Sequence, residues 1–126
     1  MTGQAFSRQY RLTKAEEYQY VFDNARRFGN PAFTLLVRPN NLGYPRLGLA
    51  ISKKNVKLAV NRNRIKRLIR ESFRHQLSEL PSVDIIAMCR TGAVVLPSAE
   101  ILKQLDSQWH YMRKKLDTHS TTDRSS

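Results

Sequence analysis

A cluster of basic residues between Lys53 and Arg74 is the part of the sequence whose residue types indicate a chemical role. Nine of these 22 residues are Lys or Arg and only Glu71 is acidic, so the segment carries about two thirds of the formal net charge of +12. A stripe of cations matches the phosphate spacing of a nucleic acid strand, and each phosphate that it neutralises releases condensed counterions. The cluster therefore predicts salt-sensitive binding to a polyanion.

The sequence offers no set of residues for catalysis by the protein itself. Its ten acidic residues are scattered along the chain and form no group typical of a two-metal site. The single cysteine, Cys89, cannot form an internal disulfide, and the three histidines lie far from it and from one another in the sequence. We therefore expect no catalytic residue and no metal held by the protein, and the lone cysteine favours a cytoplasmic setting.

The cluster is expected to form a helix over residues 61–76 with two different sides. At about 100° per residue, the apolar residues fall on one side and most cations on the other. The inner side comprises Ile65, Leu68, Ile69, Ser72, Phe73 and Gln76, and the outer side comprises Asn63, Lys66, Arg67, Arg70 and Arg74.

The charges on the outer side favour an anionic partner over a simple solvated helix face. A solvated face normally mixes both signs to gain pairs four residues apart, whereas these neighbouring cations repel one another. A helix lying on an anionic membrane is a further possibility, but the segment lacks the Trp and bulky aromatics expected at a lipid interface. A nucleic acid is the partner that the pattern favours.

The segments before the cluster predict one helix and part of a sheet. The expected elements are a helix over 14–24 and strands over 26–28, 32–38 and 46–52. Thr13 and Glu16 suggest a capping box at the start of the helix. Turn residues at 40–45 predict that the strands on either side of them pair directly as an antiparallel hairpin.

The segments after the cluster predict a buried strand and a final helix. Residues 83–89 are apolar almost throughout, as expected of a strand inside a sheet. The helix begins at Pro97 and carries an apolar stripe, whose Trp109 we assign to the core. Residues 118–126 contain no apolar side chain and predict a disordered tail.

Length and composition limit the chain to one domain. With 126 residues, 40% of them hydrophobic, we expect a single nucleic-acid-binding domain over residues 1–117 and the tail over 118–126. The order α-β-β-β-α-β-α is typical of an α+β sandwich with helices packed on one sheet. No apolar run approaches the ~20 residues that a membrane-spanning helix needs.

The motif around the cluster resembles that of a known family. Lys53 and Lys54, followed by Ala-Val-Asn-Arg-Asn-Arg-Ile-Lys-Arg-Leu-Ile-Arg-Glu over residues 59–71, are similar to the signature of the protein subunit of bacterial ribonuclease P. The resemblance extends from about residue 8 to residue 116. It includes Arg11-Leu12, Tyr18, Val21-Phe22, the strand end at 48–54 and the strand at 84–90.

The resemblance implies a ribonucleoprotein endonuclease that removes the 5′ leader of precursor tRNA to give the mature 5′ end. A catalytic RNA would hold the Mg²⁺ ions and perform the hydrolysis, while this chain would bind that RNA and the single-stranded leader in the cytoplasm, with no membrane or DNA partner. The implied fold is a mostly antiparallel sheet with a crossover through the basic helix, as in domain 2 of ribosomal protein S5.

Two groups of site residues follow from the cluster and the resemblance together. The expected RNA-binding residues are Ser52, Lys53, Lys54, Lys57, Arg62, Asn63, Arg64, Lys66, Arg67, Arg70 and Arg74. The expected leader cleft, between the first helix and the sheet, comprises Arg11, Lys14, Tyr18, Phe22, Phe33 and Leu36. Aromatic rings stack on single-stranded RNA of any sequence, although Tyr18 and Phe22 are also spaced as core residues of a helix. Leu36 departs from the aromatic often found at its position in the family.

Two other classes of protein would use the same basic helix. A non-enzymatic ribosomal or RNA-chaperone protein would bind RNA without assisting its cleavage. A DNA-binding module would place the helix in a major groove, but the segment before residue 61 predicts strand and loop where a helix-turn-helix needs another helix.

Overall fold

The computed structural model describes residues 8–125, with side chains from Arg8 to Leu116. The elements in chain order are η2 (Arg8–Tyr10), α1 (Ala15–Asp23), β1 (Arg26–Gly29), β2 (Phe33–Pro39), β3 (Arg46–Ala50), α2 (Ala59–Arg74), β4 (Val83–Cys89), η3 (Thr91–Val95) and α3 (Ser98–Ser125). This order of helices and strands confirms the predicted α+β arrangement.

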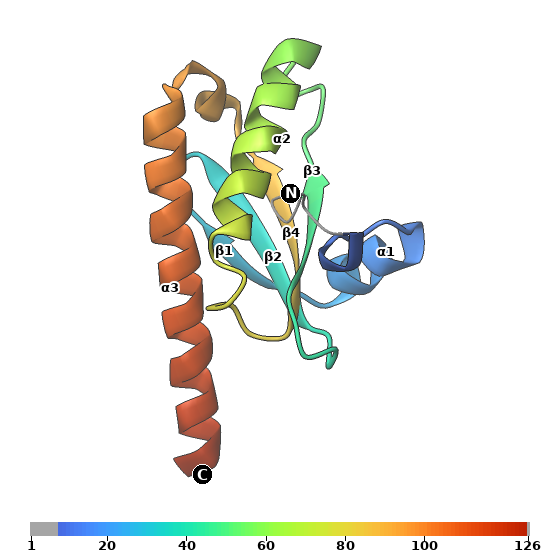
Figure 1. The fold of residues 1–126 in the computed structure, drawn as a ribbon, viewed down its shortest axis with the longest axis vertical. Coiled ribbons are helices and arrows are strands. Elements are labelled where there is room, and N and C mark those ends of the chain that lie inside the picture. The colour runs from blue at the N-terminus through green and yellow to red at the C-terminus, as the bar shows by residue number, and fades with distance from the viewer. Residues whose placement is uncertain (1–7, 126) are drawn as a thin grey trace.

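The four strands form one sheet in the order β1-β2-β4-β3 (Figure 1). β2 is antiparallel to both β1 and β4, whereas β3 runs parallel to β4, so α2 makes a crossover between two neighbouring parallel strands. The mostly antiparallel sheet and the crossover through the basic helix are confirmed.

The predicted hairpin between residues 32–38 and 46–52 is wrong. β4 lies between β2 and β3 and pairs with both, and β2 forms its hairpin with the short strand β1 instead. β4 is apolar on both sides and almost wholly buried, so the central position removes most apolar surface from water. Residues 40–45 connect β2 to β3 past the end of β4.

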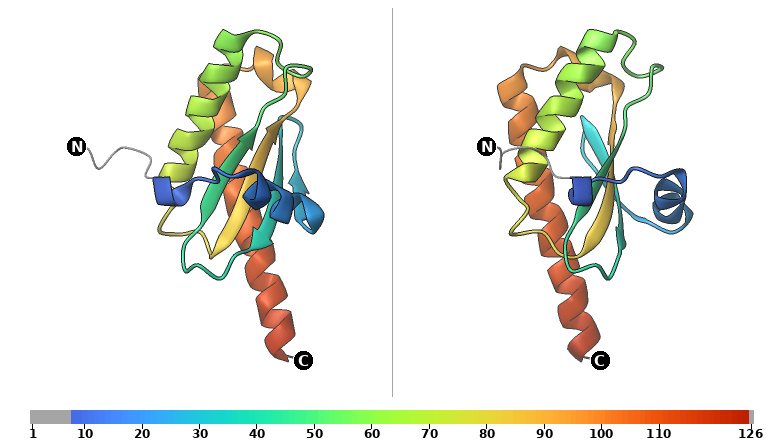
Figure 2. Two further views of the ribbon diagram at one scale, coloured as in Figure 1. Left: turned by 90° about the vertical axis from the view of Figure 1, so that its right-hand side faces the viewer. Right: turned by 45° about the vertical axis from the view of Figure 1, so that its right-hand side comes forward.

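The helices lie on opposite faces of the sheet (Figures 1 and 2). α2 and α3 cover the face to which Phe33, Leu35 and Val37 of β2 contribute, and these residues belong to the main core. On the other face, Val21 of α1 packs with Ile86 in a second, smaller core. The basic helix α2 and the helix α1 therefore lie on opposite faces of the sheet.

The stripe of α3 completes the main core. Trp109 is fully buried, its ring meets Phe73 of α2 edge-on at 5.9 Å between centroids, and its Nε1 donates to Ser72 Oγ at 2.7 Å. The assignment of Trp109 to the core is confirmed. The hydroxyl of Ser72, which is the polar member of the inner side of α2, is explained by this hydrogen bond.

The start of α1 is capped by a different residue from the one predicted. Glu17 Oε1, not the carboxylate of Glu16, accepts the backbone N–H groups of Thr13 at 2.8 Å and Lys14 at 3.0 Å. Helix α1 begins one residue later than expected, which places Glu17 rather than Glu16 at the third helical position.

The C-terminal segment was predicted to be a disordered tail over residues 118–126. The structure continues α3 to Ser125. The side chains beyond Leu116 and the whole of Ser126 lie outside the described part of the chain, so disorder of this segment stays a prediction. Within the described helices, none is both long and apolar enough to cross a bilayer.

Candidate nucleic-acid interface

The middle of the outer side of α2 carries a row of polar and basic side chains. The inner residues Ile65, Ile69 and Phe73 are fully buried, which confirms that the helix has two different sides. Among the described residues, no hydrogen bond or ion pair involves the side chains of the central outer residues, which are Asn63, Lys66, Arg67 and Arg70. Three of these are cations, so this row offers its full donor set to an anionic ligand.

Arg62 and Arg64, at the two margins of this row, hold neighbouring loops in place. Arg62 Nη1 donates to the carbonyl oxygens of Lys57 at 2.8 Å and Val56 at 3.0 Å, which fixes the chain entering α2. Arg64 Nη1 donates to Ser98 Oγ at 2.8 Å, at the start of α3. Their predicted contact with RNA stays a prediction, but part of each guanidinium is already bound within the protein.

Arg74, the last predicted cation of α2, pairs within the helix. Its Nη2 lies 2.6 Å from Glu71 Oε2, and the ring of His75 lies 3.1 Å from the same oxygen. The single acid of the cluster therefore neutralises the end of the helix and leaves the charge concentrated nearer to its middle.

The loop between β3 and α2 presents the remaining predicted cations. Ser52, Lys53, Lys54 and Lys57 are all exposed. Asn55 fixes this loop, because its Nδ2 donates to the carbonyl oxygen of Cys89 at 2.9 Å, and Ser52 Oγ accepts the Asn55 N–H at 3.2 Å. The lysines thus extend from an anchored turn beside the basic helix.

A hollow along the outer edge of β3 joins the two predicted groups of residues. It has a volume of about 260 Å³, and Arg11, Tyr18, Lys66 and Arg70 contribute to its lining. Arg11 comes from the segment before α1, Tyr18 from α1 itself, and the other two from α2. Two residues assigned to the leader and two assigned to the catalytic RNA therefore share one surface.

Tyr18 is held against β3 by close packing at a glycine. A Cβ atom on Gly48 would lie 2.8 Å from the Tyr18 ring, so only glycine lets the ring lie this close to the strand. The hydroxyl of Tyr18 accepts the N–H of Leu49 at 3.2 Å. The ring is therefore partly structural, while Phe22, about one turn further along the helix, is 48% exposed.

Phe33 does not belong to the predicted leader cleft. Its side chain is fully buried in the main core beneath α2 and α3, on the sheet face opposite α1. Leu36 lies three residues further on and therefore faces α1, where it packs beside Val21 and Met88. Lys14 is exposed directly before α1.

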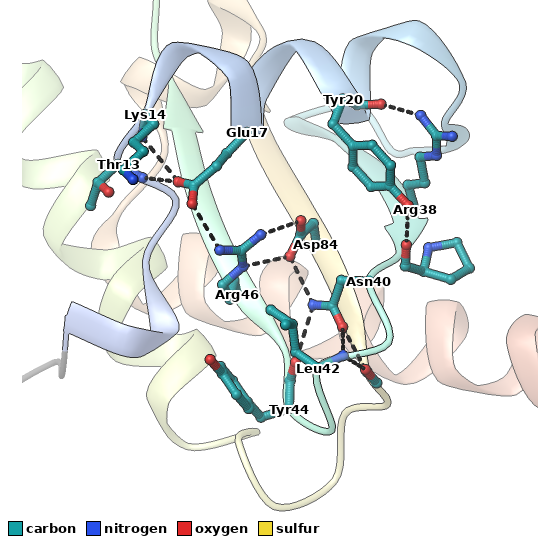
Figure 3. A network of polar contacts seen from close by, with 12 residues as sticks. Thr13, Lys14, Glu17, Tyr20, Arg38, Asn40, Leu42, Tyr44, Arg46 and Asp84 are labelled. Carbon is teal, nitrogen blue, oxygen red and sulfur yellow. Dashed lines mark hydrogen bonds and ion pairs between the residues drawn. The ribbon is translucent and has the colours of Figure 1, made fainter.

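A polar network fixes α1 on the sheet (Figure 3). Arg46 of β3 binds the fully buried Asp84 of β4 through Nε at 2.9 Å and Nη2 at 2.8 Å. The remaining Nη1 donates to Glu17 Oε2 of α1 at 2.9 Å, and Asn40 Nδ2 donates to Asp84 Oδ1 at 2.8 Å. Helix α1, which carries Tyr18, is thereby joined to two strands by paired charges.

The network shifts the ionisation of its members. Burial raises the pKa of Glu17, but the N–H groups of Lys14 and Thr13 and the guanidinium of Arg46 outweigh it, and the pKa falls below its ordinary 4.5. The hydrogen bonds from Arg46 to Asp84 raise the pKa of the guanidinium. Both groups therefore stay ionised through the neutral range.

We expect Glu17 to make stability depend on pH in acid. A carboxylate with a depressed folded-state pKa stabilises the fold above its unfolded-state pKa, and this contribution is lost as the pH falls through the folded-state value. The urea concentration at the midpoint of unfolding should therefore decrease as the pH is lowered below 4.5. Glu17→Gln should make this decrease less steep. An equally steep fall in the variant would contradict this role of Glu17.

Arg46 and Asp84 position the site and were not among the residues predicted from the sequence. One signal was available, because Asp84 is the only charged residue in the otherwise apolar segment 83–89. A carboxylate in a buried strand requires a cationic or hydrogen-bonding partner. The identity of that partner depended on the strand order, in which β3 lies beside β4.

Comparisons with known proteins identify similar chains. The family model described as Ribonuclease P matches residues 6–113. The ribonuclease P protein component of Vibrio vulnificus is 46% identical over 114 residues, covering 90% of this chain and 97% of the relative. That of Chromohalobacter salexigens is 46% identical over 121 residues, covering 95% and 94%.

A solved structure agrees in fold as well. The ribonuclease P protein of Staphylococcus aureus superposes with a TM-score of 0.77 at 31% sequence identity. The match covers 82% of this chain and 94% of that protein. The similarity therefore extends over nearly the whole length of the known proteins.

Proposed function

The chain belongs to the ribonuclease P protein family, and from this we propose that it binds the catalytic RNA of ribonuclease P and the 5′ leader of precursor tRNA. Its role as a protein component of this endoribonuclease follows from the family. The observation that carries the RNA-binding proposal is the row of cations on α2 that have no partner among the described residues, beside the exposed lysines of the preceding loop.

In this proposal the protein supplies binding and the RNA supplies the chemistry. Among the residues that the structure describes, no three His, Cys, Asp or Glu side chains gather as a metal site. The catalytic RNA would hold the Mg²⁺ ions that activate water and stabilise the leaving oxygen. The residues of α2 would neutralise phosphates near the cleavage site and so lower the Mg²⁺ concentration that the RNA requires.

Leader removal by the protein-free RNA tests this proposal. We expect the purified chain to stimulate cleavage of precursor tRNA by a ribonuclease P RNA at low Mg²⁺, where the RNA alone is slow. A basic protein of similar size and charge from another fold serves as the control for simple charge neutralisation. Equal stimulation by the control, or none by the chain, would favour the rival class of general RNA-binding or RNA-chaperone proteins.

Phe22 offers the sharper test of leader binding, because Tyr18 is partly structural. Phe22→Ala should weaken binding of leader-bearing tRNA but not of mature tRNA, by about 5- to 150-fold, since stacking contributes ~1–3 kcal/mol per base. Binding of both tRNAs to the reconstituted holoenzyme is the measurement. Tyr111→Ala removes a similarly exposed ring from α3 and should leave this discrimination unchanged. Equal weakening of both tRNAs would remove Phe22 from the leader surface.

A further inference from the structure

We propose that the hollow along the outer edge of β3 binds one phosphate group of an RNA strand together with its ribose. This inference rests on the proposed RNA-binding function and assigns to it a discrete site. The site combines the cations Arg11, Lys66 and Arg70 with the hydroxyl of Tyr18 around an apolar floor.

The charge of the hollow selects an anion. Its three cations come from two separate parts of the chain, and no acidic residue contributes to its lining. Among the described residues, none of the three side chains has an ion pair, so their repulsion is not offset within the protein. An anion bound between them would receive charge-assisted hydrogen bonds from forked guanidinium groups, a geometry that suits phosphate.

The hydroxyl of Tyr18 adds a directed donor to these charges. It accepts the N–H of Leu49 at 3.2 Å, and its own proton has no acceptor among the described residues. That proton is therefore available to a ligand oxygen, and the bond from Leu49 fixes the position of the hydroxyl. A phenylalanine at this position would keep the ring and lose the donor.

The size and floor of the hollow indicate which part of an RNA fits. A volume of about 260 Å³ is just below the range of pockets that enclose drug-sized ligands, and it is sufficient for a sugar and phosphate. Leu47 and Leu49 form an apolar floor suited to the carbon face of a ribose. The sugar and phosphate are the same in every nucleotide, so binding should be independent of the RNA sequence.

The position of the hollow explains why a phosphate would bind there. Residues of α1, which carries the exposed Phe22, and of α2 line it together. Figure 2 shows β3 between these two helices. An RNA strand whose bases stack on α1 and whose backbone continues to α2 must cross the edge of β3. A phosphate held at this crossing would join the two RNA-binding surfaces.

Titration of the isolated chain with inorganic phosphate, at constant ionic strength against chloride, tests the site. In ¹H–¹⁵N spectra, we expect the Leu49 amide to shift and saturate, because Tyr18 connects it to the ligand. Tyr18→Phe and Arg70→Gln should each weaken this saturation about tenfold, as expected for hydrogen bonds to a charged group. Arg11→Gln, in a different element, should do the same and guards against a local disturbance of α1.

Arg67→Gln is the matched control, because it removes the same charge from α2 outside the hollow. It should change the phosphate affinity at Leu49 by less than about twofold, consistent with screening beyond direct contact. Failure of the Leu49 signal to saturate, or equal weakening by Arg67→Gln and Arg70→Gln, would show a diffuse electrostatic field and overturn the site.

Neutral methylphosphonates in the RNA distinguish the two possible sources of the phosphate. If the leader supplies it, a methylphosphonate at one leader position should weaken binding to the wild-type holoenzyme. The same substitution should have no further effect on binding to the Tyr18→Phe holoenzyme. If the catalytic RNA supplies it, Tyr18→Phe should weaken binding of that RNA in the absence of tRNA. If neither effect is observed, the inference is refuted. The proposed function would still stand if the chain stimulates leader removal.

Discussion

Replacing Arg67 and Arg70 together with Ala should weaken binding of the catalytic RNA by roughly 30-fold at 0.1 M salt. Each phosphate contact contributes about 0.7–0.9 to the slope of log affinity against log salt, so the slope should become shallower by about 1.4–1.8. Both side chains are exposed and without intramolecular partners among the described residues, so the free energy of unfolding should change little. Filter binding across a salt series and urea unfolding measure the two quantities.

A second double variant controls for the loss of net charge. Lys103 and Lys115 are exposed on α3, and replacing both with Ala removes the same two charges from another helix. Its salt slope should stay close to that of the wild type. If both double variants lose affinity equally, the RNA responds to total charge and the assignment of the α2 surface fails.

Asp84→Ala should destabilise the protein by about 3–5 kcal/mol, because it leaves the Arg46 guanidinium half-buried without its main partner. Domains of this size are stable by about 5–15 kcal/mol, so the loss is a large share of the total. Urea unfolding followed by circular dichroism provides the measurement.

A paired replacement separates the cost of an unpaired charge from the value of the ion pair. The double variant Asp84→Leu, Arg46→Met should recover much of the lost stability, since apolar groups of similar volume often substitute well for a buried ion pair. The double variant should still bind leader-bearing tRNA more weakly than the wild type, because Glu17 loses its link to the sheet. Full recovery of both properties would show that the network does not position α1.

The basic helix could be predicted because its signal is periodic and local. Ile65, Ile69 and Phe73 recur at helical spacing, and their burial leaves the central cations on the outer side. The loop contacts of Arg62 and Arg64 could not be predicted in the same way. They depend on where residues 56–57 and the start of α3 lie in space, and charge alone does not distinguish an outward guanidinium from one that binds a carbonyl oxygen.

Two predictions were wrong: the direct pairing of β2 with β3, and the face of the sheet on which Phe33 lies. Direct pairing of β2 with β3 was the simplest choice from chain order, but the more apolar β4 occupies the centre of the sheet. The position of Phe33 was available from the sequence, since residues separated by an odd number in a strand face opposite sides. Phe33 and Leu36 therefore could not both face α1.

The outer margin of β3 has a consequence for the protein before it meets RNA. An uncovered strand edge is a template for unwanted association between chains, and here the N–H of Leu12 donates to the Leu47 carbonyl oxygen while Tyr18 takes the N–H of Leu49. At the other margin, β1 is only four residues long and carries Arg26 and Arg27. The edge of β3 is thus partly occupied and the edge of β1 is short and charged, and both features disfavour pairing of the sheet with a second copy of the chain.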